Sequence, residues 1–119
     1  MQVEDDKKSA AGFTAFSLVV SREDDTETIA VVGELDVATG VRLTEAIRTA
    51  EAGTAGRIVI DLSEVTFVDH PAVAMLWNTR VRLRRWGDDL EFIPPTSEAV
   101  ERFIALTGTS AFLFGPAPE

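Results

Sequence analysis

The sequence contains no cysteine in its 119 residues, which excludes disulfide bonds and thiolate metal sites. It also has no apolar run close to the roughly 20 residues that a membrane-spanning helix needs. The polar start, Met1 to Lys8, lacks the apolar core of a secretory signal. These absences predict a cytoplasmic protein without membrane insertion, which folds around an ordinary hydrophobic core.

Basic residues are scarce, since 11 Lys and Arg stand against 20 Asp and Glu, for a formal net charge of −9. Binding to a nucleic acid requires a positive surface, so we expect no nucleic-acid partner. Four arginines nevertheless lie close together, at Arg80, Arg82, Arg84 and Arg85. Near the end of a predicted helix, such cations complement the helix dipole and their stems cover apolar surface. We favour this structural interpretation over the alternative, a site for an anionic ligand.

The first half of the chain alternates strand and helix patterns. Phe13–Val20 has a mixed β pattern, and a charged turn leads to the β-branched run Thr28–Gly33, so the two are expected to pair as a hairpin. Asp36 is placed to cap a helix over Val37–Ala52, whose apolar residues recur at three- and four-residue spacing. Arg57–Asp61 follows as a central strand. This order predicts a crossover connection in a partly parallel sheet.

The second half repeats this alternation. Asp69 is placed as an N-cap for a helix over Pro71–Trp86, in which the proline suits the first turn. Leu90–Ile93 reads as a short strand, Glu98–Leu106 as a helix, and Ala111–Phe114 as a final edge strand. The residues expected to face the core are Val73, Leu76, Trp77, Val81 and Leu83, followed by Val100, Phe103, Ile104 and Leu106. We expect one domain over residues 12–115, a disordered tail over residues 1–11 and a short C-terminal tail over residues 116–119.

Several motifs occur in a characteristic order. Gly33-Glu-Leu-Asp36 follows the second strand, and Asp61-Leu-Ser-Glu-Val-Thr-Phe-Val-Asp69 leads from a strand into a helix. Gly87 precedes a strand, and Val100, Phe103 and Leu106-Thr-Gly108 mark the last third. Over about residues 13–114 the chain therefore resembles the STAS domain, the fold of the anti-sigma factor antagonists. The resemblance implies an α/β fold, a four- to five-stranded mixed sheet packed with about three or four helices.

The resemblance implies a protein-interaction module and not an enzyme. In this family the antagonist binds an anti-sigma factor, usually a serine kinase, and so frees a sigma factor for transcription. Phosphorylation of a hydroxyl residue at the start of the helix after the acidic turn abolishes the binding, and a phosphatase restores it. Carried over to this sequence, the resemblance predicts the partner-binding residues Glu34, Asp36, Asp69, His70, Pro71, Ala72 and Met75.

The sequence departs from the family at the phosphorylation site itself. The usual pattern is Asp, two hydroxyl residues and Gly, whereas this chain has Asp69, His70, Pro71 and Ala72. A phosphoryl group adds roughly two negative charges, but it needs an acceptor oxygen. Pro71 has none, so we predict a degenerate phosphosite at which partner binding persists without kinase control.

Other interpretations of the same residues remain open. Asp36 and Asp69 also fit plain helix caps, and Glu34 a solvated loop residue. His70 is the only histidine, but with Asp69 it supplies too few ligands for a metal, and no nucleophile and base accompany it. We therefore expect no catalytic residue, metal or cofactor. STAS domains also serve as accessory subunits of lipid or anion transport systems and as ligand-sensing modules, which is the competing hypothesis. A homodimer through the edge of the first strands is a further alternative.

Overall fold

The computed structural model describes residues 2–6 and 16–115, which form five strands and four helices. The strands are β1 (Gln2–Asp6), β2 (Phe16–Glu23), β3 (Thr26–Leu35), β4 (Arg57–Val68) and β5 (Glu91–Ile93). The helices are α1 (Val37–Glu51), α2 (His70–Arg85), α3 (Glu98–Leu106) and α4 (Ser110–Phe114). The predicted α/β class is confirmed.

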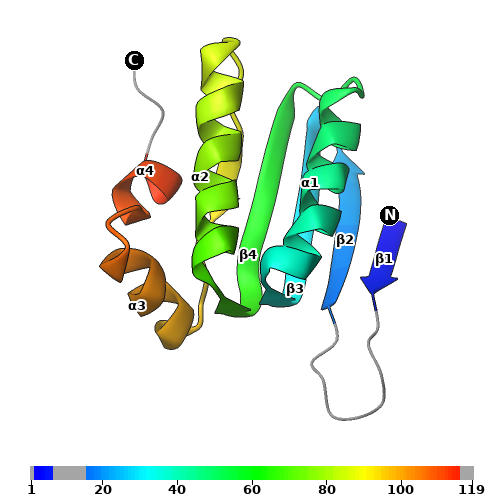
Figure 1. The fold of residues 1–119 in the computed structure, drawn as a ribbon. Helices are drawn as coiled ribbons and strands as arrows, with labels where there is room; N and C mark the ends of the chain where they lie inside the picture. Colours follow the sequence, from blue (N-terminus) through cyan, green and yellow to red (C-terminus); the bar gives the residue numbers. More distant parts are fainter. Residues whose placement is uncertain (1, 7–15, 116–119) are drawn as a thin grey trace.

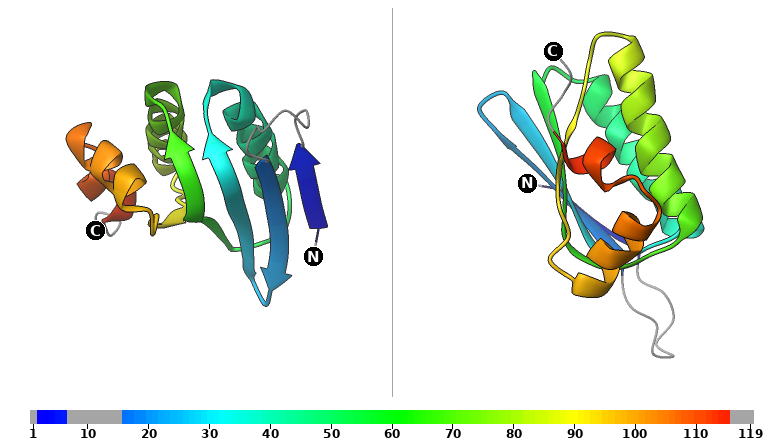
Figure 2. Two further views of the ribbon diagram at one scale, coloured as in Figure 1. Left: turned by 90° about the horizontal axis from the view of Figure 1, so that it is seen from below. Right: turned by 90° about the vertical axis from the view of Figure 1, so that its left-hand side faces the viewer.

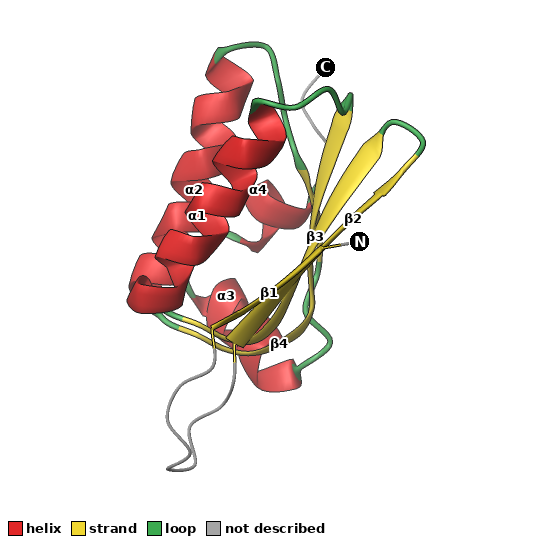
Figure 3. Ribbon diagram, turned by 90° about the vertical axis from the view of Figure 1, so that its right-hand side faces the viewer, coloured by secondary structure: helices red, strands yellow, loops and turns green. Residues whose placement is uncertain are grey.

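The strands form one mixed sheet in the order β1-β2-β3-β4-β5 (Figure 1). β1, β2 and β3 are antiparallel neighbours, whereas β3–β4 and β4–β5 are parallel pairs. A parallel pair needs a crossover, so α1 joins β3 to β4 and α2 precedes β5. Both helices lie on one face of the sheet, as the edge-on views show (Figures 2 and 3). The shorter α3 and α4 lie beside α2 at the β5 side (Figure 1).

The hydrophobic core lies between this sheet and its helices. Alternate residues of β3 point inward, and Ile29, Val31 and Leu35 are buried. Leu43 and Ile47 on α1 are four residues apart, so they lie on one helix face and are buried in the same cluster. Each fully buried aliphatic side chain of this kind contributes about 1.5–3 kcal/mol relative to an exposed one.

The parallel pairing of β3 with β4 is interrupted twice, between Ala30 and Val32 and between Gly33 and Glu34. At each interruption β4 carries one residue more than β3, as in a β-bulge. Gly33 has a φ of 102°, a conformation that a residue without Cβ adopts readily. The buried residues in the second half of β4 therefore fall three apart, at Leu62, Val65 and Val68. The predicted strand Arg57–Asp61 covers only the unbroken apolar run, whereas β4 continues to Val68 with this different spacing.

The prediction of a final edge strand at Ala111–Phe114 is wrong, because this segment belongs to the helix α4. The guanidinium of Arg80 donates from Nη1 to the carbonyl oxygens of Phe112 and Leu113, at 2.9 and 2.5 Å. These bonds occupy acceptors that an edge strand would need for its ladder. Since Arg80 lies more than 30 residues away, the local sequence carried no sign of them.

The expected disordered tail also differs, because residues 2–6 form β1 and pair along the edge of β2. The free N–H and C=O groups of an edge strand are a template for such pairing, even for a segment of low β propensity. The rest of that tail, the start of the predicted first strand and the C-terminal tail fall at residues 7–15 and 116–119. These lie outside the described residues.

Some core assignments were wrong in detail. Trp77 and Val81 are half-buried, while Thr79 and Arg80 of the same helix are buried in their place. Leu106, expected to face inward, is 81% exposed. It is the last residue of α3 and lies just before the chain turns at Gly108, whose φ is 78°.

Candidate interaction surface at the start of α1 and α2

The first turns of α1 and α2 lie at the same end of the sheet (Figure 1). Because β3 and β4 are parallel neighbours, the chain leaves both strands at one edge. A single residue separates each strand from its helix, Asp36 after β3 and Asp69 after β4. Both aspartates have extended backbone angles and cap the helices that follow.

Asp36 forms a capping box with Thr39. Its Oδ1 accepts hydrogen bonds from the backbone N–H groups of Ala38 and Thr39, at 3.0 and 2.9 Å. The Asp36 N–H in turn donates to the Thr39 hydroxyl, which donates to the carbonyl oxygen of Glu34 at 2.8 Å. The backbone bond from Thr39 is the main cause that lowers the pKa of the Asp36 carboxyl, against the opposing effect of burial. The capping box thus joins the end of β3 to the first turn of α1, and the lowered pKa favours the ionised carboxylate of Asp36.

Asp69 contacts both helices. Its Oδ1 accepts from the N–H of Ala72 at 2.9 Å and so caps α2. Its Oδ2 accepts from the N–H of Val37 at 3.3 Å, at the start of α1. Two N–H groups that would otherwise point to solvent at the helix ends are thereby satisfied. The side chain of Asp69 joins the two first turns.

His70 and Pro71 form an exposed ridge at the first turn of α2. The imidazole of His70 lies against the ring of Phe103 on α3, with 4.9 Å between centroids and an angle of 62°. Pro71 needs no N–H at this position, and its fixed φ suits the helix start. Neither side chain carries a hydroxyl group, so neither can be a phosphoacceptor of the serine type.

One apolar groove runs along the side of this ridge that faces α1. This α1–α2 groove has a volume of about 300 Å³. It is lined by Asp36, Val37, Gly40, Val41, Thr44, Glu45, Arg48, Pro71, Ala72 and Met75. Val37 and Val41 are 66% and 58% exposed, whereas Ala72 is buried. At Gly40 a Cβ would meet Met75 Cε at 3.5 Å, an ordinary van der Waals contact between the two helices.

A second groove lies on the other side of the ridge, between the end of β4 and α3. This Phe67 groove has a volume of about 270 Å³. It is lined by Thr66, Phe67, Val68, Asp69, His70, Ala99, Val100 and Phe103. Val68 and Val100 are buried beneath it, and Phe67 is 46% exposed. The exposure of Phe67 follows from the second bulge in β4, which depends on the pairing of that strand with β3.

The seven predicted interface residues come together at this end of the molecule. Asp36, Pro71, Ala72 and Met75 line the α1–α2 groove, and Asp69 and His70 line the Phe67 groove. Glu34 is half-buried at the end of β3. Ala72 offers little surface of its own, since it is buried. The exposed apolar residues Val37, Val41 and Phe67 were not predicted. For Val37, its place directly after the capping Asp36 was the available signal.

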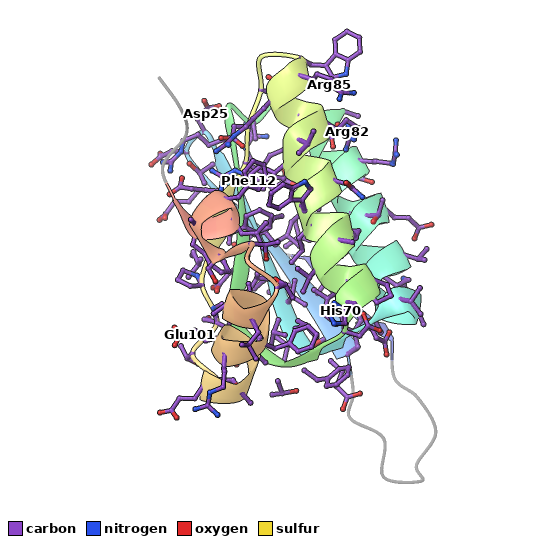
Figure 4. All side chains as sticks on the ribbon, turned by 60° about the vertical axis from the view of Figure 1, so that its left-hand side comes forward. Asp25, His70, Arg82, Arg85, Glu101 and Phe112 are labelled. Carbon is purple, nitrogen blue, oxygen red and sulfur yellow. The ribbon has the colours of Figure 1, made fainter. Side chains whose placement is uncertain are left out.

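The arginines lie toward the opposite end of α2 from His70 (Figure 4). Three of them form ion pairs, Arg80–Asp89, Arg82–Glu51 and Arg84–Asp89, with N–O distances of 3.0, 2.8 and 3.1 Å. Burial opposes the ionisation of Asp89, but hydrogen bonds from Arg80, the Leu90 N–H and Arg84 lower its pKa. A nearby hollow of about 570 Å³ is lined by Arg80 and Asp89 of the first ion pair, together with the charged residues Arg57, Asp88 and Glu91. Arg80, Arg82 and Arg84 therefore connect α2 to neighbouring parts of the chain by ion pairs, which agrees with the structural interpretation of these residues.

Comparison with known proteins assigns the family. A family model described as "Mlab, STAS domain" matches residues 18–114. The chain belongs to the STAS domain family. A search of curated proteins finds no match to this sequence.

Solved structures share the fold. An anti-sigma factor antagonist from Mycobacterium paratuberculosis is 28% identical, with 87% of this chain and 86% of that chain covered and a TM-score of 0.71. The antagonist SpoIIAA in its unphosphorylated form is 20% identical, with coverages of 86% and 89% and a TM-score of 0.65. The murine anion transporter Slc26a9 is 17% identical over 76% of this chain and 15% of that chain, with a TM-score of 0.61. At these last two identities the likeness concerns the fold alone.

In residues 2–6 and 16–115, no group of three or more His, Asp or Glu side chains is arranged to hold a metal ion. In the same part of the chain, no helix has the length and apolar character needed to cross a membrane.

Proposed function

We propose that this protein is a non-enzymatic, cytoplasmic antagonist that binds an anti-sigma factor of the serine-kinase type and escapes phosphorylation at the family's usual position. One observation carries the proposal. Asp69 joins the first turns of α1 and α2 into one exposed surface, and Pro71 stands there in place of a hydroxyl residue.

The chemistry of this surface supports a protein partner. Val37 and Val41 expose apolar area beside the α1–α2 groove, and exposed apolar clusters of this kind mark interaction sites. Three carboxylates lie near them, at Glu34, Asp36 and Glu45, against one cation in the groove lining, Arg48. A partner surface with apolar side chains and Lys or Arg complements both features.

Pro71 determines the regulation that we propose. A phosphoryl group on a serine here would add charge at the centre of the contact, next to Asp69. Pro71 excludes that reaction and also favours the helical conformation of the first turn. Binding to the kinase is then constitutive, and in a cell with phosphorylatable antagonists this chain competes with them for the same anti-sigma factor.

The direct test is a pull-down from the source cell, followed by purification of the captured kinase-like anti-sigma factor and measurement of its affinity. Saturable binding that weakens when Glu34 is changed to Lys supports the proposal. Absence of binding to any purified kinase-like anti-sigma factor of that cell overturns it.

A second candidate function is that of an accessory STAS subunit of a lipid or anion transport system, or of a ligand-sensing module. The observation behind this candidate is the similar domain within the anion transporter Slc26a9. Capture of a transport protein from solubilised membranes, with binding that also depends on Glu34, would support it over the anti-sigma factor.

A further inference from the structure

We propose that the Phe67 groove is a second docking subsite, which takes an apolar side chain from a basic segment of the partner that covers Pro71. This inference rests on the proposed function for the identity of the partner. It adds residues of β4 and α3 to the predicted set, of which Asp69 and His70 also line this groove.

The walls of the groove are suited to an apolar anchor. Phe67 is nearly half exposed on one side, and Phe103 is half-buried on the other. Val68 and Val100 close the floor. Aromatic side chains around a pocket of this size are typical anchors at the centre of an interface, where a partner's side chain excludes the remaining water.

The apolar surface continues along α3. Ala99, Phe103 and Leu106 are spaced four and three residues apart, so they form one stripe on the helix. This stripe is distinct from the buried residues Val100 and Ile104, which face the core. Leu106 is among the most exposed large apolar residues of the described chain. A partner helix lying beside α3 would find anchor positions along its whole length.

The charges around the groove favour a basic occupant. Of its lining residues, only Asp69 and His70 are ionisable, and both Asp69 oxygens already accept hydrogen bonds. Beyond the lining, the exposed charges on the same stretch of β4 and on α3 are Glu64, Glu98 and Glu101, against one cation, Arg102. A second copy of this chain would bring the same acidic excess and be repelled, whereas Lys or Arg beside an apolar anchor is complementary.

The two grooves belong to one continuous surface. His70 lines the Phe67 groove, Pro71 lines the α1–α2 groove, and the two residues are consecutive on the ridge between them. A partner that covers Pro71 therefore borders both grooves. A single partner with two apolar anchors separated by this ridge fits the surface better than one that uses the α1 side alone.

The test compares two exposed aromatic residues at opposite ends of α2. Phe67→Ser should lower the affinity for the purified anti-sigma factor about tenfold, as expected for an interface anchor. Trp86→Ser is the matched control, because Trp86 is 79% exposed just beyond the far end of the helix, and it should leave the affinity unchanged. Leu106→Ser, at a position that the core does not use, should give a smaller loss. Thermal unfolding checks that each variant folds.

A second measurement is independent of the anti-sigma factor. A short amphipathic peptide of Leu and Lys is titrated into the isotope-labelled protein, beside a counterpart with Glu in place of Lys. We expect amide chemical shifts to move at Phe67, His70 and Phe103 with the Lys peptide alone.

The outcomes separate the two proposals. If Phe67→Ser and Leu106→Ser both leave the affinity unchanged while Glu34→Lys weakens it, the second subsite is overturned and the proposed function stands. If the native protein binds no anti-sigma factor but the Lys peptide shifts the groove residues, the proposed function fails and the basic, apolar occupant is supported. If neither peptide shifts them, the groove's preference for a basic segment is overturned.

Discussion

The carboxylate of Asp69 accepts a hydrogen bond from the N–H of Val37 at 3.3 Å while it caps its own helix through Ala72. One side chain therefore sets the spacing between the first turns of α1 and α2. The surface that we propose as the partner site includes both of these first turns. Its shape therefore depends on Asp69, which is itself only partly exposed.

Replacing Asp69 with Ala should lower the free energy of unfolding by about 0.5–2 kcal/mol, the usual cost of a lost N-cap. We expect a value in the upper part of this range, because the N–H of Val37 loses its partner as well. Urea denaturation measures the change. Asp88→Ala, at an exposed position beyond the other end of α2, is the control and should stay within about 0.5 kcal/mol. Equal stability of both variants would contradict the link.

Incubation with the cognate kinase-like anti-sigma factor and ATP should leave the intact mass of the native protein unchanged, because Pro71 has no acceptor oxygen. Pro71→Ser should gain one phosphoryl group, since the helix N-terminus can accommodate the charge. Intact-mass spectrometry after the incubation measures the mass gain of both proteins. Phosphorylation of the native chain within residues 63–72 would refute the proposed loss of control. An inert Pro71→Ser variant that still binds the kinase would show that its docking geometry differs too.

Charge reversal at the rim of the α1–α2 groove should weaken the anti-sigma factor complex without unfolding the protein. Glu45→Lys is the cleaner change, because Glu45 is exposed and its side chain forms no hydrogen bond within the described part of the chain. Asp36→Lys would remove the capping box as well, at a cost of about 0.5–2 kcal/mol in stability. Affinity measured by calorimetry should fall for Glu45→Lys and remain unchanged for Glu23→Lys on the distant β2–β3 hairpin. Equal affinities would remove this rim from the interface.

The stability contributed by Asp89 should depend on pH. Its pKa is lowered in the folded protein, so its stabilisation is complete above the ordinary value of 3.8 and is lost as the pH falls through the folded-state pKa. Asp89→Asn should therefore be less stable than the native protein near neutral pH, and the difference should shrink below about pH 4. Denaturation curves across this range give the comparison, with Asp88→Asn as the control. A difference that stays constant down to strongly acidic pH would exclude an ionised Asp89 as its source.

Much of the fold followed from local patterns. The two N-caps, the start of α1 and the bounds of α3 agree with the sequence predictions, because capping and helix periodicity act over a few neighbouring residues. The short strand β5 was predicted to within one residue of its observed bounds, because its short apolar run is also a local pattern. The STAS motifs then ordered these elements correctly.

Long-range contacts explain the errors. Arg80 donates hydrogen bonds to carbonyl groups of α4 that lie more than 30 positions along the chain, in a segment that was predicted as a strand. The bulges in β4 depend on its pairing with β3, so no periodicity within β4 itself predicted how far the strand extends.

By itself, the sequence determined that two aspartates would start two helices and that His70 and Pro71, at the start of the second, would carry no hydroxyl group. These are properties of residues and their nearest neighbours. Only the tertiary structure decided that Asp69 would also bond to Val37, and that Phe67 would stand exposed beside His70. Both depend on the parallel pairing of β3 with β4, which brings together residues from distant parts of the chain.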